Sequence, residues 1–247
     1  MKLTFLGTGE ACDPTRPNTS LLLETDSDFH LLDCGFTVPH AFFGHCLNPE
    51  QLKTLWISHF HGDHFFGVPL LLLRLWEMGR KGPLQIISGV AADEKIWAAL
   101  ELAYPNFRER LQFPVCFTQL KPGEKFRYRH LDYMVAATVH SQPSFALKIE
   151  KGNKSFYYSG DGRATTEAEE LMQGCDLIVH EAFTLEDRME THGSIASCLS
   201  LQKKSRCPKM ALVHLSRQTR QEQGPLAKIL SEKQRIYLAD DGEQLIL

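Results

Sequence analysis

The chain has 247 residues, of which 43% are hydrophobic and 23% are charged, and its formal net charge is −3. This length and composition can bury a sizeable core without disulfides, so we expect one folded domain over residues 1–247. The slightly negative charge excludes a general attraction to phosphate backbones, and nucleic-acid binding would need a local basic patch. The seven cysteines include no C-x-x-C pair, which is typical of reduced thiols in a cytoplasmic protein.

The first part of the chain predicts a sheet followed by alternating strands and helices. Strands separated by turns rich in glycine, proline and asparagine are expected at 1–7, 19–25 and 29–35. Because the first strand begins at once, we expect no signal peptide, and the longest apolar run, 68–73, is too short to span a bilayer. Apolar periodicity then indicates strands at 52–58 and 84–88 and helices at 69–79 and 91–104.

The second part of the chain repeats this plan. Strands are expected at 126–140, within 144–161, and at 176–183, 210–216, 235–239 and 243–247, with a hairpin turn at 151–154. Helices are expected at 165–174, 194–204 and 224–233. Strand-rich halves interleaved with helices favour two packed sheets with helices on the outside.

The most informative motif is HFHGDH, which contains His59, His61, Asp63 and His64. It lies between an expected strand and an expected helix, where catalytic residues are often found. Two histidines in a loop usually form no more than a polar turn. The added aspartate and third histidine favour a metal site, because imidazoles and carboxylates bind zinc and related divalent ions.

Three further candidates stand at the ends of expected strands: His140 in ATVHS, Asp161 in YSGDG and His214 in LVHLS. Taken singly, each histidine is best interpreted as structural and the aspartate before glycine as a turn former. Together with HFHGDH they complete a set of five histidines and two aspartates. Such a set suffices for two metal ions that share one bridging carboxylate.

At these motifs the chain resembles the metallo-β-lactamase superfamily, and within it most closely the ribonuclease Z group. The resemblance also covers FLGTGEA, NTS, LLDCG, HEAF at 180–183 and THGS at 191–194. It implies a mixed α/β fold, an αββα sandwich with two metals at one edge between the sheets. It further implies that one metal is held by His59, His61 and His140 and the other by Asp63, His64 and His214, with Asp161 bridging them.

The chemistry implied by the resemblance is phosphodiester hydrolysis. Two divalent ions about 3.5–4 Å apart lower the pKa of a bridging water and so provide hydroxide at neutral pH. The leaving oxygen needs a proton, and the resemblance places Glu181 and His192 as the pair that gives it, while Asp63 is a candidate to accept the proton of the water. His180 is interpreted as structural and Cys34 as a small buried hydrophobe. No role is assigned to His30, His40, His45 and His130.

One departure from the ribonuclease Z group affects the expected substrate. The long arm that grips tRNA in that group would be inserted before the bridging aspartate, where this chain has only EKGNKSFYY. The preferred hypothesis is therefore a metal-dependent phosphodiesterase acting on a small phosphodiester or an RNA 3′ end. The alternatives are tRNA 3′-endonuclease activity, hydrolysis of esters, thioesters, sulfates or lactones, and a non-catalytic or redox metal protein.

The metal, the assembly and the location follow from weaker signals. Zinc is the expected metal from the ligand types, while manganese and iron are also compatible with histidine and aspartate. The resemblance favours a homodimer. The cysteine pattern favours the cytoplasm, and no membrane partner is expected.

Overall fold

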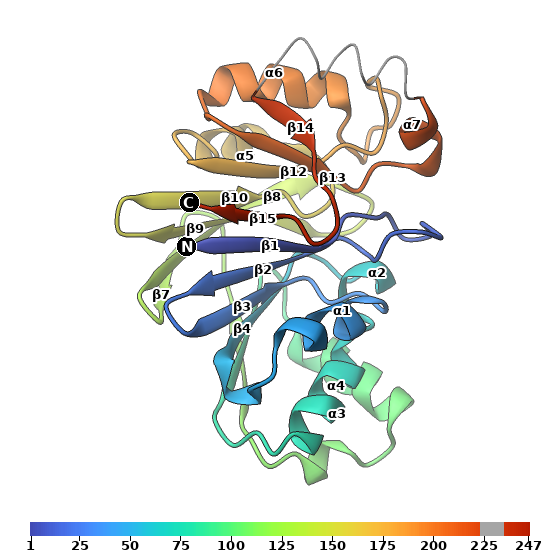
Figure 1. Ribbon diagram of the computed structural model, residues 1–247, viewed down its shortest axis with the longest axis vertical. Coiled ribbons are helices and arrows are strands. Elements are labelled where there is room, and N and C mark those ends of the chain that lie inside the picture. Colours follow the sequence, from blue (N-terminus) through green and yellow to red (C-terminus); the bar gives the residue numbers. More distant parts are fainter. Residues whose placement is uncertain (223–234) are drawn as a thin grey trace.

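The structure is a computed structural model that describes residues 1–222 and 235–247. Two β-sheets lie face to face in the middle of the molecule, and helices cover the outer face of each sheet (Figure 1). The layers run helix, sheet, sheet, helix, which confirms the expected αββα sandwich. The helix expected at 224–233 lies outside the described residues.

The first sheet has the strand order β15-β1-β2-β3-β4-β5-β6. Strands β15, β1, β2 and β3 are antiparallel neighbours, and β3 to β6 are parallel. The strands are β1 (Lys2–Gly7), β2 (Ser20–Thr25), β3 (Asp28–Leu32), β4 (Leu52–Ile57), β5 (Leu84–Ser88), β6 (Val115–Gln119) and β15 (Gln244–Ile246). The helices packed on this sheet are α1 (Val38–His45), α2 (Gly62–Phe65), α3 (Val68–Glu77) and α4 (Asp93–Ala103), with 3-10 turns η1 (Pro49–Gln51) and η2 (Arg108–Arg110).

The second sheet has the strand order β11-β8-β9-β10-β12-β13-β14, and β7 also pairs with β8. Strands β8, β9 and β10 are antiparallel, and β10, β12, β13 and β14 are parallel. The strands are β7 (Lys125–Tyr128), β8 (Leu131–Val139), β9 (Ser144–Lys151), β10 (Lys154–Tyr158), β11 (Arg163–Ala164), β12 (Leu177–Glu181), β13 (Met210–Val213) and β14 (Ile236–Leu238). The helices of this half are α5 (Thr166–Leu171), α6 (Ile195–Ser205) and α7 (Arg217–Gln221).

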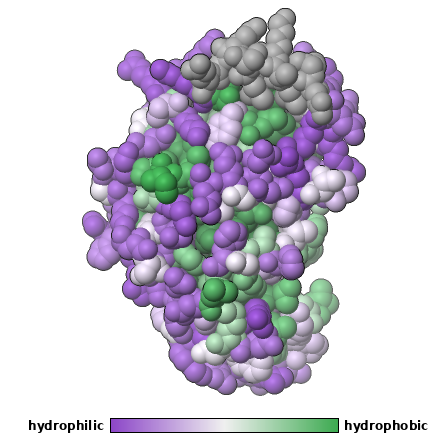
Figure 2. All heavy atoms as spheres, viewed as in Figure 1, coloured by the Kyte–Doolittle hydropathy of each residue, from purple (hydrophilic) through white to green (hydrophobic). Residues whose placement is uncertain are grey.

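Apolar side chains of the strands alternate between two cores. Leu21 and Leu23 of β2 pack between the sheets, while Leu22 packs against the helices. In β5, Ile86 faces the helices and Ile87 faces the other sheet. Because both faces of each sheet are covered, these strands read as continuous apolar runs, whereas the molecular face seen in Figure 2 is largely hydrophilic. None of the described helices has the length and apolarity needed to cross a membrane.

Two elements differ from the sequence prediction for backbone reasons. The strand expected at 29–35 ends at Leu32, because Asp33 has a φ of 59° and turns the chain. The strand expected at 126–140 is instead a hairpin of β7 and β8, with Arg129 and His130 in the left-handed region at its turn. The bounds of helices α3, α4 and α6 lie within two residues of the expected bounds. The antiparallel start and the hairpin at Gly152 are confirmed.

His30 is a buried structural histidine in β3. Its Nδ1 lies 2.9 Å from Thr54 Oγ1 and 3.2 Å from the Tyr133 hydroxyl, and its Nε2 lies 3.1 Å from Thr25 Oγ1. Burial, aided by nearby positive charges, lowers the pKa of His30 from 6.5 to about 3. The imidazole therefore stays neutral in the folded chain.

This shift predicts a pH-dependent loss of stability. As the pH falls from 6.5 towards 3, the unfolded chain binds a proton at His30 that the folded chain does not bind, so the free energy of unfolding decreases by up to about 1.4 kcal/mol per pH unit. In the variant His30→Gln this component is expected to vanish. Urea unfolding of chelated wild type and variant at several pH values below 6.5 measures both slopes, and equal slopes would contradict the prediction.

Candidate metal centre

The candidate site lies at one edge of the sandwich, where several strands end. Strands β10, β12 and β13 are parallel neighbours. Asp161 follows β10 by three residues, Glu181 is the last residue of β12, and His214 directly follows β13. Because carboxyl ends of parallel strands meet at one edge of a sheet, the fold itself brings these side chains together. His140 directly follows β8. In the facing sheet, His59 and His61 follow β4, and Asp63 and His64 lie in the short helix α2.

The loop after β3 supports the HFHGDH loop through the backbone. The Cys34 amide donates to the carbonyl of His64 over 2.7 Å, and the Gly67 amide donates to the carbonyl of Cys34 over 2.9 Å. A Cβ atom at Gly35 would collide with the backbone carbonyl of Asp63. Only glycine therefore lets the two loops approach this closely.

The first group of candidate ligands is His59, His61, His140 and Asp161. His61 Nδ1 lies 3.0 Å from both His59 Nε2 and His140 Nε2. Asp161 Oδ2 lies 3.8 Å from His59 Nε2. The outward nitrogen of His140, Nδ1, lies 2.9 Å from the carbonyl oxygen of Thr191, so its proton is on the side away from the group.

The second group is Asp63, His64, His214 and Asp161. Asp63 Oδ2 lies 3.3 Å from His64 Nε2 and 3.2 Å from His214 Nε2. Asp161 Oδ2 lies 3.4 Å from each of these two nitrogens. Asp161 therefore belongs to both groups, which is the position that the sequence resemblance gives to a bridging carboxylate.

The donor atoms of both groups fit divalent metal ions. Nitrogen and oxygen ligands about 2.0–2.2 Å from a tetrahedral ion stand about 3.3–3.6 Å apart, which is close to the spacing of each group. Within the described part of the chain, His64 Nε2 and Asp161 Oδ1 are buried and accept no hydrogen bond. A buried polar atom without a partner costs free energy, and an ion in contact with these two atoms would remove that cost.

The pKa shifts of His59, His61 and Asp161 suit metal binding. Burial, together with neighbouring histidines, lowers the pKa of His59 and His61, so their imidazoles are neutral and have a lone pair to give. Burial alone would raise the pKa of Asp161, but the charges of His214 and His64 outweigh it and hold this pKa well below the ordinary value. The carboxylate is therefore ionised. Burial alone would lower the pKa of His64 and His214, but the charge of Asp161 and its neighbours raises it above the ordinary value, so these two imidazoles release a proton when they bind an ion.

Asp33 is a residue of the site that sequence reasoning missed. Its Oδ2 lies 2.8 Å from His64 Nδ1 and accepts hydrogen bonds from the hydroxyls of Ser58 and Tyr158 over 2.8 and 2.7 Å. Its Oδ1 accepts from the Ser58 amide over 2.7 Å. A carboxylate in this place fixes the tautomer of His64 with Nε2 free to bind a metal. A signal was available, because Asp33 ends an apolar strand just as Asp161 and His214 do.

Replacing Asp33 by asparagine is expected to weaken metal binding by about 10- to 100-fold, because His64 loses the acceptor that orients it. Competition with a coloured chelator measures the affinity. The variant Asp26→Asn is the matched control, because Asp26 is an exposed aspartate whose partner is the surface residue Lys151. Equal affinities of the two variants would show that the contact between Asp33 and His64 does not matter.

Glu181 and His192 lie together beside the second group. Glu181 Oε1 lies 3.2 Å from His192 Nδ1 and accepts from the amides of Gly162 and Gly193 over 3.0 and 2.7 Å. Its Oε2 accepts from the Phe183 amide over 3.0 Å. Burial alone would lower the pKa of His192, but the hydrogen bond and charge of Glu181 raise it above the ordinary value. The pair is arranged to hold a proton close to the candidate ligands.

The ring of His192 lies among the candidate ligands. Its centroid is 4.8 Å from that of His140 and 6.0 Å from that of His214, and it stacks on Phe183. The other histidines lie apart from the two ligand groups. The Nδ1 of His180 lies 2.7 Å from the carbonyl oxygen of Glu181, next to Cys198 of α6. Among the described residues, the possible metal clusters do not include His40, His45 or His130. Cys34 is buried, which raises the pKa of its thiol.

Two named relatives are similar to this chain over most of its length, and a third is similar over about half of it. The chain is 24% identical to a ribonuclease Z of Methanosarcina acetivorans over 92% of each chain. It is 26% identical to a ribonuclease Z of Listeria monocytogenes over 96% of this chain and 95% of the relative. A protein of Bos taurus named zinc phosphodiesterase ELAC protein 1 is 35% identical over 127 residues, which are 49% of this chain and 34% of the relative.

Solved structures have the same fold. The short form of human tRNase Z superposes with a TM-score of 0.80 at 24% identity and covers 100% of this chain and 99% of its own. The metallo-β-lactamase-fold protein YhfI of Bacillus subtilis superposes with a TM-score of 0.79 at 17% identity, over 99% and 98% of the two chains. The resemblance to the metallo-β-lactamase superfamily and its ribonuclease Z group is confirmed.

A family model described as "Anti-Pycsar protein Apyc1" matches residues 1–237. This match includes every candidate ligand and the Glu181–His192 pair. The chain therefore belongs to the Anti-Pycsar protein Apyc1 family and has the metallo-β-lactamase fold of its ribonuclease Z relatives.

Proposed function

We propose that this chain is a divalent metal-dependent hydrolase of phosphodiester bonds. The observation that carries the proposal is the pair of ligand groups that share Asp161 and adjoin Glu181 and His192. The relatives named ribonuclease Z and zinc phosphodiesterase support this reaction class. We propose His59, His61, Asp63, His64, His140, Asp161 and His214 as the metal ligands.

The ions supply a water of lowered pKa and neutralise charge on the phosphoryl group when they are bound. The side chains of the protein accept the proton of the water and donate a proton to the leaving oxygen. Asp63 Oδ2, held within 3.3 Å of His64 and His214, is the proposed acceptor of the water proton. His192 is the proposed donor to the leaving oxygen, because Glu181 holds its Nδ1 and stabilises the protonated ring.

Zinc is the proposed metal. Five imidazoles and two carboxylates suit zinc, and one relative is named a zinc phosphodiesterase. Manganese and iron accept the same donor types. Elemental analysis of the protein purified without added metal decides among them.

A small phosphodiester or an RNA 3′ end is the proposed substrate. Strands β9 and β10 pair up to Lys151 and Lys154, so only Gly152 and Asn153 form the turn where the resemblance would place the tRNA-gripping arm. The net charge of −3 also gives no general attraction to a large RNA. We further propose a homodimer in the cytoplasm, and sedimentation of the purified protein tests its assembly.

A second candidate function is tRNA 3′ processing itself. It is favoured by identity of 24–26% to proteins named ribonuclease Z over nearly the whole chain. Cleavage of a precursor tRNA at a rate that falls steeply with salt would support it over the first candidate. The purified protein should therefore be assayed against a panel of substrates. Cyclic nucleotides and aryl phosphodiesters represent small phosphodiesters, and esters, thioesters, sulfates and lactones are included because hydroxide attacks these electrophiles as well.

Removing the metal tests the proposed function directly. We expect hydrolysis of a bis-aryl phosphate to be lost on chelation, restored by zinc, and lost again in the variant His64→Ala. His40→Ala is the matched control, because His40 is an exposed histidine on α1 and should leave the rate unchanged. A metal-loaded protein inert towards every phosphodiester, or activity that survives chelation, would refute the proposal.

A further inference from the structure

The segment between β12 and α6, residues 184–193, holds two parts of the candidate site at once. We call it the His192 loop. The carbonyl of Thr191 is the partner of His140 Nδ1, and His192 and the Gly193 amide contact the Glu181 carboxylate. The geometry of the proposed proton donor therefore depends on where this loop lies.

The outer part of the loop has few attachments. Residues 186–190 form no helix or strand, and Glu186, Asp187, Arg188 and Glu190 are exposed. Asp187 Oδ1 accepts from the Ser194 hydroxyl over 2.6 Å at the start of α6. In the described part of the chain, the one side chain outside residues 184–205 that makes a polar contact with residues 186–190 is that of Arg163.

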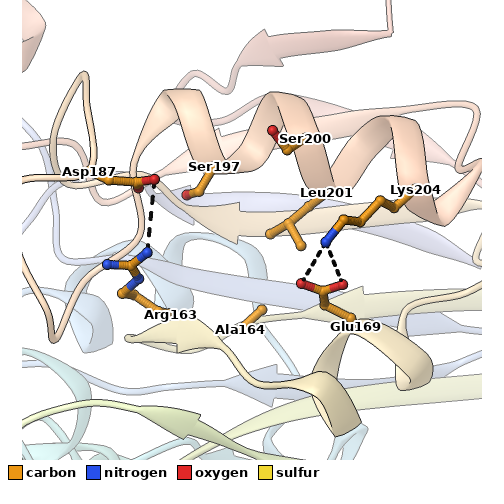
Figure 3. A pocket seen from close by; sticks show the side chains of 8 residues that line it. All are labelled: Arg163, Ala164, Glu169, Asp187, Ser197, Ser200, Leu201 and Lys204. Atoms are coloured by element: carbon orange, nitrogen blue, oxygen red, sulfur yellow. Dashed lines mark hydrogen bonds and ion pairs between the residues drawn. The ribbon is translucent and has the colours of Figure 1, made fainter.

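Arg163 reaches the loop from the strand that follows Asp161. Its Nη1 donates to the carbonyl of Met189 over 3.4 Å, and its Nη2 lies 3.9 Å from Asp187 Oδ2 (Figure 3). Arg163 and Asp187 line a pocket with a volume of about 180 Å³. Figure 3 shows the guanidinium of Arg163 pointing up from β11 towards Asp187.

The base of Arg163 is itself fixed to the site. Arg163 and Ala164 pair with Val139 and Thr138 of β8, the strand that ends just before His140. The Gly162 amide donates to Glu181, and the Thr138 hydroxyl donates to the carbonyl of Asp161. These contacts fix the start of β11 relative to the candidate ligands. The side chain of Arg163 reaches from this fixed position to the His192 loop.

We propose that Arg163 is a positioning residue that holds the His192 loop, and through it His192, against the metal centre. This role rests on the proposed function, since it assumes that His192 gives the proton. The two contacts are long and half-exposed, so their loss is expected to raise the open population of the loop by only about three- to fivefold. A misplacement of about 1 Å at the donor is nevertheless enough to slow a reaction by up to about 100-fold.

The same pocket provides a matched control. Lys204 of α6 lies 3.0 Å from Glu169 of α5, on the side of the pocket away from the loop (Figure 3). Lys204→Met removes one positive charge and one exposed ion pair, as Arg163→Met does, without contact to residues 184–193. Arg163→Lys keeps the charge and is expected to retain part of the effect of arginine.

The first measurement needs no activity. Hydrogen–deuterium exchange of the metal-free protein is followed in peptides covering 184–196. We expect exchange about three- to fivefold faster in Arg163→Met, smaller acceleration in Arg163→Lys, and the wild-type rate in Lys204→Met. Wild-type exchange in both arginine variants would overturn the proposal. If Arg163→Met fails to fold, Arg163→Lys against Lys204→Met decides by the same comparison.

The second measurement uses phosphodiesters with a series of leaving groups. Arg163→Met is expected to lower kcat for poor leaving groups by about tenfold, to leave KM nearly unchanged, and to have little effect on a p-nitrophenyl ester. A uniform loss across the series would contradict a positioning role. A wild type inactive on every phosphodiester would refute the proposed function instead, while the exchange result would still decide whether Arg163 holds the loop.

Discussion

Replacing Asp161 by alanine is expected to abolish binding of both metal ions in one step. Asp161 is the member shared by the two ligand groups, and its Oδ2 lies within 3.8 Å of His59, His64 and His214. Because two ions contribute several kcal/mol of stabilisation to the transition state, phosphodiester hydrolysis should fall by more than about 1000-fold. Elemental analysis after gel filtration gives the number of ions per chain, and initial rates give the activity.

A variant of a ligand in one group alone is the control for this prediction. His140 belongs only to the first group, so His140→Ala should retain about one ion per chain where Asp161→Ala retains none. Both variants should stay folded, because the backbone carbonyl of Asp161 still accepts from the hydroxyls of Thr138 and Ser144. Two ions per chain in Asp161→Ala would exclude this aspartate as a shared ligand.

The features that the sequence predicts well are local or repeat a simple rule. HFHGDH is a single short segment, and its composition alone indicates a metal loop. His140, Asp161 and His214 follow one rule, a polar residue at the end of a buried strand, and parallel strands carry such residues to one edge. The core strands are predicted for a similarly local reason, since a short continuous apolar run indicates a strand that is covered on both faces.

The features that the sequence does not predict depend on distant contacts or on weak periodicity. Helix α1, with the sequence VPHAFFGH, has apolar residues on most sides, and β6 is only half-buried, so neither shows the period of its element. The role of Asp33 requires His64 to come within 2.8 Å across 31 residues of sequence. The contact of Arg163 with Met189 joins strand β11 to a loop 26 residues away and depends on where both lie in the fold.

Replacing His192 by alanine is expected to act according to the leaving group. With an alkoxide leaving group, which needs a proton, hydrolysis should slow by about 10²- to 10⁴-fold. With p-nitrophenolate, which departs as a stable anion, the rate should change far less. The reason is the pair itself: Glu181 Oε1 lies 3.2 Å from His192 Nδ1, so the carboxylate stabilises the protonated ring that donates. Initial rates for a series of leaving groups measure the dependence.

Glu181 and His192 should also behave as one unit. Glu181 is proposed to act by holding the protonated ring of His192. Once His192 is replaced, the further change Glu181→Gln should therefore have no effect, and the double variant should hydrolyse its substrate no more slowly than the slower single variant. His192 has one alternative role, that of a metal ligand. Its ring also lies in a group with Glu181 and His214 that could hold a metal ion. An equal loss for all leaving groups, together with a loss of bound metal, would therefore make His192 a ligand and leave the proton donor to be sought among other groups.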